Sequence, residues 1–288
     1  MGRTYSKLMH CLIFLALVAV QPDAVSASNS CGEVVTVAAH AGTTMQYAYA
    51  PAVGAAASPA RTTLVMLVGG GGYINLDEKG CPQLLSRNSL IRMSPLLRDA
   101  GIAIALVDAP SDLRSDEGLG GFRVASEHAN DLGAVIADVR ARTHGAVWIA
   151  GHSRGTISAA NAAGRLTGLS APDGLVLMSA ITVGDVKARK FWVAHTVFSV
   201  DLEAIKSPVL VIGHVADSCV RSPAGLMNNI IAKTHGSREQ VVAVTGGPIS
   251  PGRSPDVATC EPREPHDFVD QEVEVAAGIV RFIRGGSY

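Results

Sequence analysis

Short apolar runs alternate with amphipathic segments along most of the chain. The runs are short and rich in valine, isoleucine and leucine, which is typical of strands covered on both faces of a parallel sheet. The segment 127–140 instead places its apolar residues at helical spacing, on one face. This alternation predicts an α/β fold built on a mostly parallel sheet. The expected strands are 62–68, 102–107, 147–150, 174–180, 208–215 and 240–245.

Other segments complete this pattern. Residues 33–50 contain two β-forming runs, which predict an antiparallel hairpin ahead of the sheet. A helix is expected over 82–100, with Gly101 as its stop. Another is expected to start at Ser222, as the N-cap, with Pro223 in the first turn. A closing helix is expected to bury one apolar face. This face consists of Val269, Val273, Ala276, Val280 and Ile283.

Residues 151–155 read Gly-His-Ser-Arg-Gly and stand between the apolar run 147–150 and an alanine-rich segment, 156–163. A strand, a sharp turn and a helix, with the serine at the tip, form a nucleophile elbow. Such a turn crowds the backbone, so the positions two before and two after Ser153 must lack a Cβ. Both are glycine. The small alanines that follow allow the expected helix to pack closely in the middle of a fold.

With these features the chain resembles the α/β-hydrolase superfamily, and the resemblance covers most of the chain after about residue 60. It implies a mostly parallel sheet with helices on both faces, and a triad in the chain order Ser, Asp or Glu, His. Asp217 follows an expected strand, and His266 lies in the loop before the last helix. The implied triad is therefore Ser153, Asp217 and His266. Because the superfamily hosts many activities, the resemblance implies no substrate.

Each member of this triad has a chemical role. The histidine takes the serine proton and later passes it to the leaving group, while the carboxylate holds the imidazole in the right tautomer. Asp185, after the preceding strand, is an alternative acid. His152 adjoins the serine, but an elbow directs that side chain elsewhere. His214, within a strand, and His235, near a helix end, suit structural roles better.

Four consecutive glycines, 69–72, follow a central strand and leave backbone N–H groups unshielded. The resemblance implies that this loop donates one N–H to the oxyanion and that the residue after the serine donates the other. We assign the second donor to Arg154 and the first to Gly70 or Gly71. The alternatives are a flexible linker and a phosphate loop. A phosphate loop would require Gly-Lys-Ser or Gly-Lys-Thr, which is missing.

Two further features border the expected site. Asp108 ends a strand, where it either contacts the substrate or fixes the following loop through backbone hydrogen bonds. The segment 181–207 occupies the place where the superfamily inserts a lid, and it holds Phe191, Trp192 and Phe198 among charges. It either forms a short cap over an apolar acyl or aryl pocket, or packs its aromatic residues on the domain's own surface.

The composition supports one large domain. The 288 residues are 48% hydrophobic and only 17% charged, which is enough for a sizeable core. With 24 basic and 25 acidic residues the net charge is −1. The basic residues form no run interleaved with aromatic residues, so we expect no nucleic-acid partner.

The N-terminus has the pattern of a secretory signal peptide. Arg3 and Lys7 precede a ten-residue apolar run, 11–20, and Val-Ser-Ala before residue 28 suits a cleavage site. We expect 1–27 to be a signal peptide and 28–288 a single secreted or periplasmic domain with no membrane span. The alternative is an uncleaved anchor, although the run is short for a bilayer.

Export changes how the cysteines are interpreted. Cys11 leaves with the signal peptide, and Cys31, Cys81, Cys219 and Cys260 remain, an even number in an oxidising compartment. The four cysteines allow three pairings, and a free Cys219 near a reactive site is a further alternative. Cys219 and Cys260 lie close in sequence to two members of the implied triad, so a disulfide between them would join the triad loops. The other pair is then Cys31 with Cys81. No Cys/His cluster has zinc spacing, and we expect neither a metal nor a cofactor.

These features together favour a secreted serine hydrolase that cleaves a small-molecule carboxylic ester. The same triad would also serve a peptidase, a thioesterase or a lactonase. A non-catalytic binding protein that kept the fold, and a cofactor-free haloperoxidase or dioxygenase, are the alternatives from other classes. The sequence gives no indication of the oligomeric state.

Overall fold

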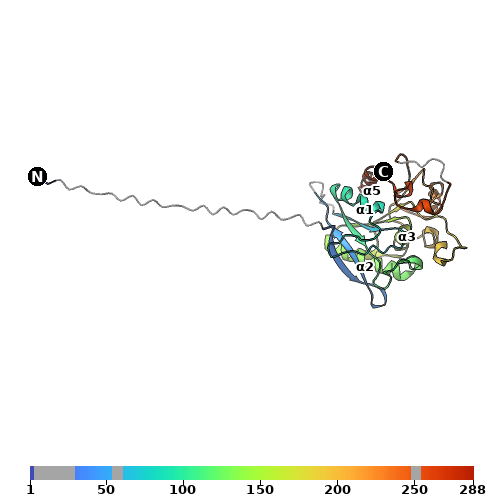
Figure 1. Ribbon diagram of the computed structural model, residues 1–288, viewed down its shortest axis with the longest axis horizontal. Helices are drawn as coiled ribbons and strands as arrows, with labels where there is room; N and C mark the ends of the chain where they lie inside the picture. Colours follow the sequence, from blue (N-terminus) through green and yellow to red (C-terminus); the bar gives the residue numbers. More distant parts are fainter. Residues whose placement is uncertain (3–29, 54–60, 248–253) are drawn as a thin grey trace.

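The computed structural model describes residues 1–2, 30–53, 61–247 and 254–288 (Figure 1). Within these residues, eight strands form one sheet in the order β1-β2-β4-β3-β5-β6-β7-β8. The pairs β1–β2 and β2–β4 are antiparallel, and the other five pairs are parallel. The fold class expected from the sequence, α/β with a mostly parallel sheet, is confirmed.

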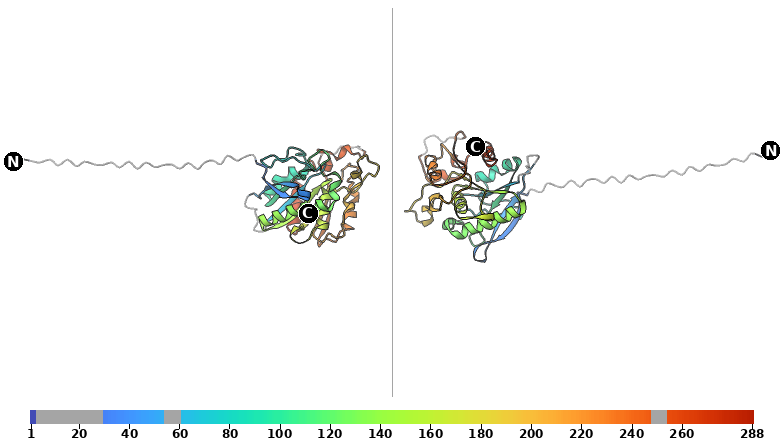
Figure 2. Two further views of the ribbon diagram at one scale, coloured as in Figure 1. Left: turned by 90° about the horizontal axis from the view of Figure 1, so that it is seen from below. Right: turned by 180° about the vertical axis from the view of Figure 1, so that it is seen from behind.

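Every apolar run expected to be a strand contains one. The inner strands are buried along nearly their whole length, which explains their continuous apolar composition. Of the edge strands, β1 has only half-buried and exposed residues, and β8 is largely half-buried. The left view of Figure 2 shows the blue hairpin and the orange C-terminal strands toward opposite ends of the domain. The strands are β1 (Glu33–Ala38), β2 (Thr44–Ala50), β3 (Thr62–Leu67), β4 (Ile102–Val107), β5 (Ala146–His152), β6 (Gly174–Met178), β7 (Val209–His214) and β8 (Glu239–Val244).

Helices cover both faces of the sheet. α1 (Ser89–Asp99) packs with α5 (Glu272–Ile283) on one face, and α2 (Ser126–Thr143) packs with α3 (Gly155–Arg165) on the other (Figure 1). A short helix, α4 (Asn228–Ile231), lies beside β7 and β8. Because successive strand residues point to opposite faces, β3 contributes alternate residues to two separate cores.

Two expected helices differ from the structure at their starts. The segment 82–88 is not helical: Leu85 has a φ of 53°, and the Asn88 side chain accepts from the Leu90 N–H and caps α1 there. The closing helix begins only at Glu272, so Val269 precedes it. Val273 is 71% exposed rather than buried. The first two residues of the predicted apolar face are therefore wrong, because the first buried residue of α5 is Val275.

The segment 181–207 consists of loops and two 3₁₀ turns, Phe191–Ala194 and Val197–Ser199. Its second half enters the core, where Val197 is fully buried. Its first half lies over the loop around Gly120, with Trp192 against that glycine. Phe191 is 73% exposed. Residues 183–195, called the cap below, thus pack their aromatic side chains on this loop, and the second half of the segment belongs to the body of the domain.

The four cysteines after residue 30 form two disulfides. Cys31 joins Cys81 with an S–S distance of 2.12 Å, and Cys219 joins Cys260 at 2.03 Å. This is the pairing expected from the sequence. The expected signal peptide, residues 1–27, lies almost wholly outside the described residues. Within the described residues, no helix combines the length and apolarity needed to cross a bilayer.

Non-reducing peptide mapping of the purified protein should recover one peptide pair linked through Cys219–Cys260 and another through Cys31–Cys81. The Cys219 bridge closes a loop of 41 residues in sequence, for which chain entropy predicts a stabilisation of about 4 kcal/mol at most. Alkylation of Cys219 and Cys260 without prior reduction would contradict this pairing. A Cys219→Ser, Cys260→Ser double variant should accordingly melt at a lower temperature.

Candidate active site

Ser153 stands at a sharp turn between β5 and α3, in the left-handed region with a φ of 52°. A Cβ on Gly151 would lie 2.4 Å from the carbonyl oxygen of Gly155, and one on Gly155 would lie 2.1 Å from that of Leu67. Only glycine fits at these two positions. The Ser153 N–H donates to the Met178 carbonyl at 2.9 Å, which fixes the turn to β6. A strained serine held in this way is typical of a functional site.

The glycine loop lies directly against the serine. A Cβ on Gly69 would lie 2.8 Å from Ser153 Cβ and 3.3 Å from Ser153 Oγ. A side chain at position 69 would therefore displace either the nucleophile or the loop.

We expect Gly69→Ala to lower kcat by about 10²-fold or more, because a small displacement of reacting groups is costly. Gly225→Ala is a matched control, since a Cβ there would meet no atom within 4 Å. Steady-state kinetics and circular dichroism of both variants test this expectation. Equal kcat values for the two folded variants would show that the contact between Gly69 and Ser153 has no catalytic importance.

His266 and Asp217 form a buried hydrogen-bonded pair. The distance from His266 Nδ1 to Asp217 Oδ2 is 2.9 Å, and only 1% of each side chain is exposed. Asp217 follows β7, and its other carboxylate oxygen accepts the Cys219 N–H at 2.8 Å. His266 lies in the 3₁₀ turn Pro265–Asp267. The carboxylate is thus oriented by the backbone on one side and holds the imidazole on the other.

Ser222 belongs to this group and was missed by the sequence analysis. Its Oγ lies 2.9 Å from Asp217 Oδ2 and 2.9 Å from His266 Nδ1. The prediction that it caps a helix is wrong, because the residues after it form a 3₁₀ turn and α4 begins only at Asn228. A serine before a proline is common at helix starts, so its sequence context gave no indication of a contact with Asp217.

The alternative acid and bases lie in other contacts. Asp185 is paired with Arg221 at 3.1 Å. His214 Nε2 is 2.9 Å from the Gly246 carbonyl, and its Nδ1 accepts the Ala216 N–H. His235 is exposed at the surface. The side chains of these residues make no hydrogen bond to Asp217 or His266 within the described residues, although the His214 carbonyl accepts the Asp217 N–H at 3.0 Å.

The His152 side chain holds the turn that carries His266 by a hydrogen bond to its backbone. The Asn88 amide donates to His152 Nδ1 at 2.8 Å, so Nε2 carries the proton and donates to the His266 carbonyl at 3.0 Å. Burial lowers the pKa of His152 to about 4, and the positive charge that His266 can carry adds to this lowering. His152 is therefore neutral at physiological pH. The Ser179 hydroxyl donates to the same carbonyl at 2.7 Å, so two side chains fix the position of His266.

The residue after His266 anchors this turn to α1. Asp267 accepts the Ser89 N–H at 2.9 Å and forms an ion pair with Arg92. Arg92 also donates to the Asp267 carbonyl at 2.7 Å and pairs with Glu272 at 2.8 Å. These contacts join α1 to the segment from Asp267 to Glu272, whose residues lie 175 to 180 positions further along the chain.

Arg123 plays a similar part under the glycine loop. It is fully buried, and it donates to the carbonyl oxygens of Val68 at 3.3 Å and Gly70 at 3.1 Å, and to Ser158 Oγ at 2.8 Å. Within the described residues no carboxylate lies at ion-pair distance from it. Burial, with a smaller effect of Arg154, places the pKa of Arg123 well below its usual value. Its hydrogen bonds fix peptide groups on both sides of the Gly70 N–H.

Three backbone N–H groups near Ser153 are unoccupied. Within the described residues, the N–H groups of Gly70, Gly71 and Arg154 donate to no backbone acceptor. The two loop glycines differ in their neighbours, because a Cβ on Gly71 would lie 2.9 Å from the Asp116 carbonyl, whereas one on Gly70 would lie 3.5 Å from the Leu85 side chain.

The imidazole nitrogen of His266 that does not face Asp217 has no hydrogen-bond partner among the described residues. His266 Nε2 is buried and has no hydrogen-bond partner among the described residues, Ser153 Oγ included. Catalytic hydrogen bonds are often long before substrate binds and tighten in the complex. Burial of a polar nitrogen without a partner is unfavourable, so this nitrogen calls for an explanation.

Two other features of the structure, the Asp108 carboxylate and a cluster of potential metal-ligand atoms, have structural explanations. The Asp108 carboxylate accepts the N–H groups of Ile74, Leu76 and Ala109, so it fixes the segment after the glycine loop. Potential metal-ligand atoms of Asp217, Cys219 and His266 lie within 4.8 Å of one another. The Cys219 sulfur is bonded to Cys260 and the other two side chains bond each other, so this group does not fit a metal site.

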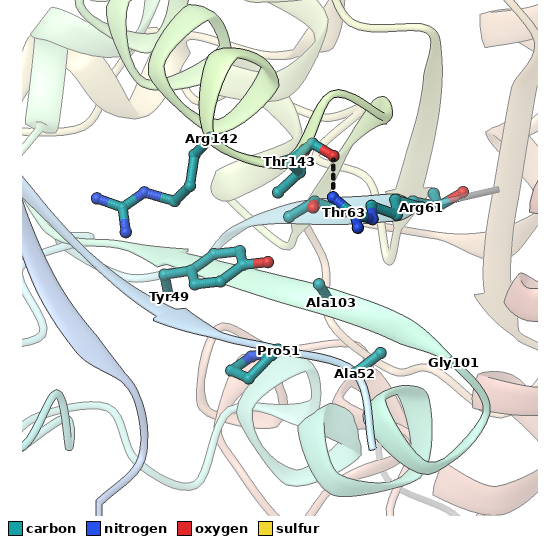
Figure 3. Close-up of a pocket in the computed structure, with 10 residues that line it drawn as sticks. Tyr49, Pro51, Ala52, Arg61, Thr63, Gly101, Ala103, Arg142 and Thr143 are labelled. Atoms are coloured by element: carbon teal, nitrogen blue, oxygen red, sulfur yellow. Dashed lines mark hydrogen bonds between the residues drawn. The ribbon is translucent and has the colours of Figure 1, made fainter. Parts of the chain in front are cut away.

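A pocket of about 410 Å³ (Figure 3) lies at the ends of the parallel strands opposite to Ser153. Tyr49, Arg61, Thr63 and Arg142 line it, where β3 and β4 begin. Ser153 follows the end of β5, a seven-residue strand, and such a strand is about 20 Å long. The pocket is therefore too far away to hold a substrate of Ser153.

No protein-family model matches the chain, and no curated protein matches its sequence. Solved structures do match. An α/β serine hydrolase without a lid from Xanthomonas campestris aligns with a TM-score of 0.52 and 16% identity, over 87% of this chain and 93% of that chain. A soluble variant of monoglyceride lipase from Saccharomyces cerevisiae aligns with a TM-score of 0.60 and 12% identity, over 93% and 99%.

A dienelactone hydrolase from Anabaena variabilis aligns with a TM-score of 0.54 and 16% identity, over 88% of this chain and 97% of that chain. The chain has the α/β-hydrolase fold. At such low identity the similarity extends to the architecture, since one fold hosts many activities. In the structure, Ser153 follows β5, Asp217 follows β7 and His266 precedes α5.

Proposed function

We propose that this protein is a serine hydrolase that cleaves carboxylic esters of small molecules. Ser153 is the nucleophile, His266 the general base and acid, and Asp217 the carboxylate that orients the histidine. The proposal depends above all on the buried pair between Asp217 and His266, together with a strained serine at the tip of the elbow. A buried histidine is suited to proton transfer when a carboxylate holds one imidazole nitrogen and the other nitrogen is unpaired.

The cycle follows from this geometry. His266 Nε2 takes the proton of Ser153 Oγ as the oxygen attacks the ester carbonyl, and the imidazolium is stabilised by Asp217. The tetrahedral intermediate collapses when Nε2 protonates the departing alcohol, which leaves an acyl-enzyme. Water, deprotonated by the same nitrogen, then releases the acid and restores Ser153. Ser222 keeps a hydrogen bond to the carboxylate throughout.

The oxyanion is assigned to two backbone donors, the N–H groups of Arg154 and Gly70. Gly70 is favoured over Gly71 because the loop contacts Ser153 at Gly69, the preceding residue, whereas Gly71 faces Asp116. Arg123 fixes the carbonyl groups on both sides of the Gly70 N–H. Fixed donors of this kind stabilise developing charge without reorganisation.

The ester assignment is supported by the names of similar structures, which include a monoglyceride lipase and a dienelactone hydrolase. A panel of p-nitrophenyl esters of increasing acyl length, beside matched amide, thioester and lactone substrates, tests it. Highest kcat/KM on the carboxylic esters is expected. A clear preference for amides, thioesters or lactones would assign the chain to peptidases, thioesterases or lactonases.

A fluorophosphonate probe separates a catalyst from a binding protein that kept the fold. Covalent labelling at Ser153, located by peptide mass spectrometry, is expected because an activated serine attacks the phosphorus. Absence of labelling together with absence of hydrolysis across the panel would favour the binding protein.

We further propose that the protein is exported after cleavage near residue 28. The residues 1–27 have the pattern of a signal peptide, and two disulfides suit an oxidising compartment. The intact mass of the protein purified from its native compartment should therefore correspond to a chain that begins near Ser28. A species that retains the first 27 residues in the membrane fraction would support an anchor instead.

A further inference from the structure

The side chain of Arg154 is a cation without an anionic partner. Its guanidinium stacks on Trp192 of the cap, with Cζ 4.2 Å from the ring centroid. Its hydrogen bonds, to the carbonyl oxygens of Gly120 at 3.4 Å and Trp192 at 3.5 Å, are both long. Within the described residues, no carboxylate lies at ion-pair distance from it.

The groups around Arg154 add positive charge or hydrogen-bond donors. Burial and the charge of Arg221 lower the pKa of Arg154 to about 10, so it is charged at neutral pH. The Nδ1 atom of His195, in the cap, is buried without a hydrogen-bond partner, and burial, with Arg154, lowers the pKa of this histidine. Burial without a counter-ion is unfavourable for a cation, so an anion bound beside Arg154 would stabilise it.

The nearby carboxylates are engaged elsewhere. Asp185 pairs with Arg221 at 3.1 Å. Glu117 pairs with Lys190 at 2.7 Å and accepts the Trp192 indole N–H at 3.4 Å. Among the described residues around the cap, Arg154 therefore has no carboxylate partner, whereas Arg221 and Lys190 each have one.

Arg154 is also next to the reacting centre. It follows the nucleophile, so its Cα lies about 3.8 Å from that of Ser153. Its side chain runs from the elbow toward the cap, where stacking on Trp192 limits its rotation. A molecule bound to Ser153 and extending under the cap would meet this guanidinium.

We propose that Arg154 binds a carboxylate carried by the substrate, so that this site prefers esters of acidic molecules. The inference rests on the proposed ester hydrolase function and adds the substrate class to it. A guanidinium recognises a carboxylate through two parallel hydrogen bonds. The remaining donors of Arg154 and the His195 ring are available for such an anion. A role confined to holding the cap through Trp192 is the competing explanation, and it predicts no charge preference.

Two pairs of esters test the preference and locate the carboxylate. For the acyl side, the mono-p-nitrophenyl ester of adipic acid is compared with p-nitrophenyl hexanoate, which has the same chain length. For the alcohol side, 4-butanoyloxybenzoate is compared with phenyl butanoate. In one of the two pairs, the acidic ester is expected to have a kcat/KM about 10- to 100-fold higher, as for a hydrogen bond to a charged group. The measured quantity is the ratio of acidic to neutral ester.

Variants assign the preference to Arg154. Arg154→Gln should bring the ratio close to one, and Arg154→Lys, which keeps the charge but not the planar fork, should retain part of it. Arg189→Gln removes an exposed cation from the same cap and should leave the ratio unchanged. Circular dichroism confirms that each variant is folded.

Three outcomes overturn the inference. They are a wild-type ratio near one in both pairs, an unchanged ratio in a folded Arg154→Gln variant, and an equal loss in the Arg189→Gln variant. Each of them leaves the ester hydrolase proposal intact as long as the neutral esters are cleaved through Ser153. If wild-type protein cleaves no ester and the fluorophosphonate does not label it, the proposed function fails, and the inference fails with it.

Discussion

Ser153→Ala is expected to abolish nearly all ester hydrolysis, with a loss in kcat of about 10⁴-fold or more. Without the hydroxyl no acyl-enzyme forms, and only the oxyanion donors and binding remain. Ser153 Oγ makes no hydrogen bond within the described residues, so its removal should cost less than about 1 kcal/mol in the free energy of unfolding. The measurements are kcat on a neutral p-nitrophenyl ester and the melting temperature.

The Ser153→Ala result is interpreted together with fluorophosphonate labelling of the variant and of the wild-type protein. The wild-type protein should react with the fluorophosphonate, and Ser153→Ala should not. Turnover near the wild-type level in the variant would move the active site away from the elbow. Loss of both activity and the folded signal would report on stability alone, and in that case labelling of wild-type Ser153 decides the assignment.

Features encoded locally could be predicted from the sequence. A buried parallel strand requires a continuous apolar run, and each run of that kind contains a strand in the structure. The elbow also depends on local steric constraints, because only glycine fits two residues on either side of Ser153. The pair of Asp217 and His266 was inferred from chain order in the α/β-hydrolase fold, and the structure brings the two side chains together.

Features that depend on tertiary packing could not be predicted. Ser222 looked like a helix cap, because nothing in its neighbours shows that the chain folds it onto Asp217. The buried cation Arg123 contacts the glycine loop about 50 residues earlier in the chain, and no periodicity reports such a contact. His152 was expected to point away from the serine, but its target, the His266 carbonyl, lies 114 positions further along the chain.

The acid of the triad provides the second large effect. Asp217→Asn should lower kcat by about 10⁴-fold, because an amide N–H facing His266 Nδ1 would hold the imidazole in the wrong tautomer. The Nε2 atom would then carry the proton and could not accept one from the serine. The Ser222 hydroxyl, which donates to the same carboxylate oxygen that His266 contacts, would also lose its acceptor, whereas the Cys219 N–H would keep the other oxygen. We therefore expect some loss of stability together with the loss of activity.

Asp185→Asn is the matched control for that experiment. It removes one negative charge from the same side of the domain, but its partner is Arg221 and its carboxylate lies in an exposed ion pair. Exposed ion pairs contribute about 0–1 kcal/mol, so kcat should change less than about threefold. The two kcat values, measured on one neutral ester with the folded fraction determined by circular dichroism, rank the two acids. A larger loss in Asp185→Asn would transfer the role of the acid to Asp185 and leave the buried contact between Asp217 and His266 without a catalytic explanation.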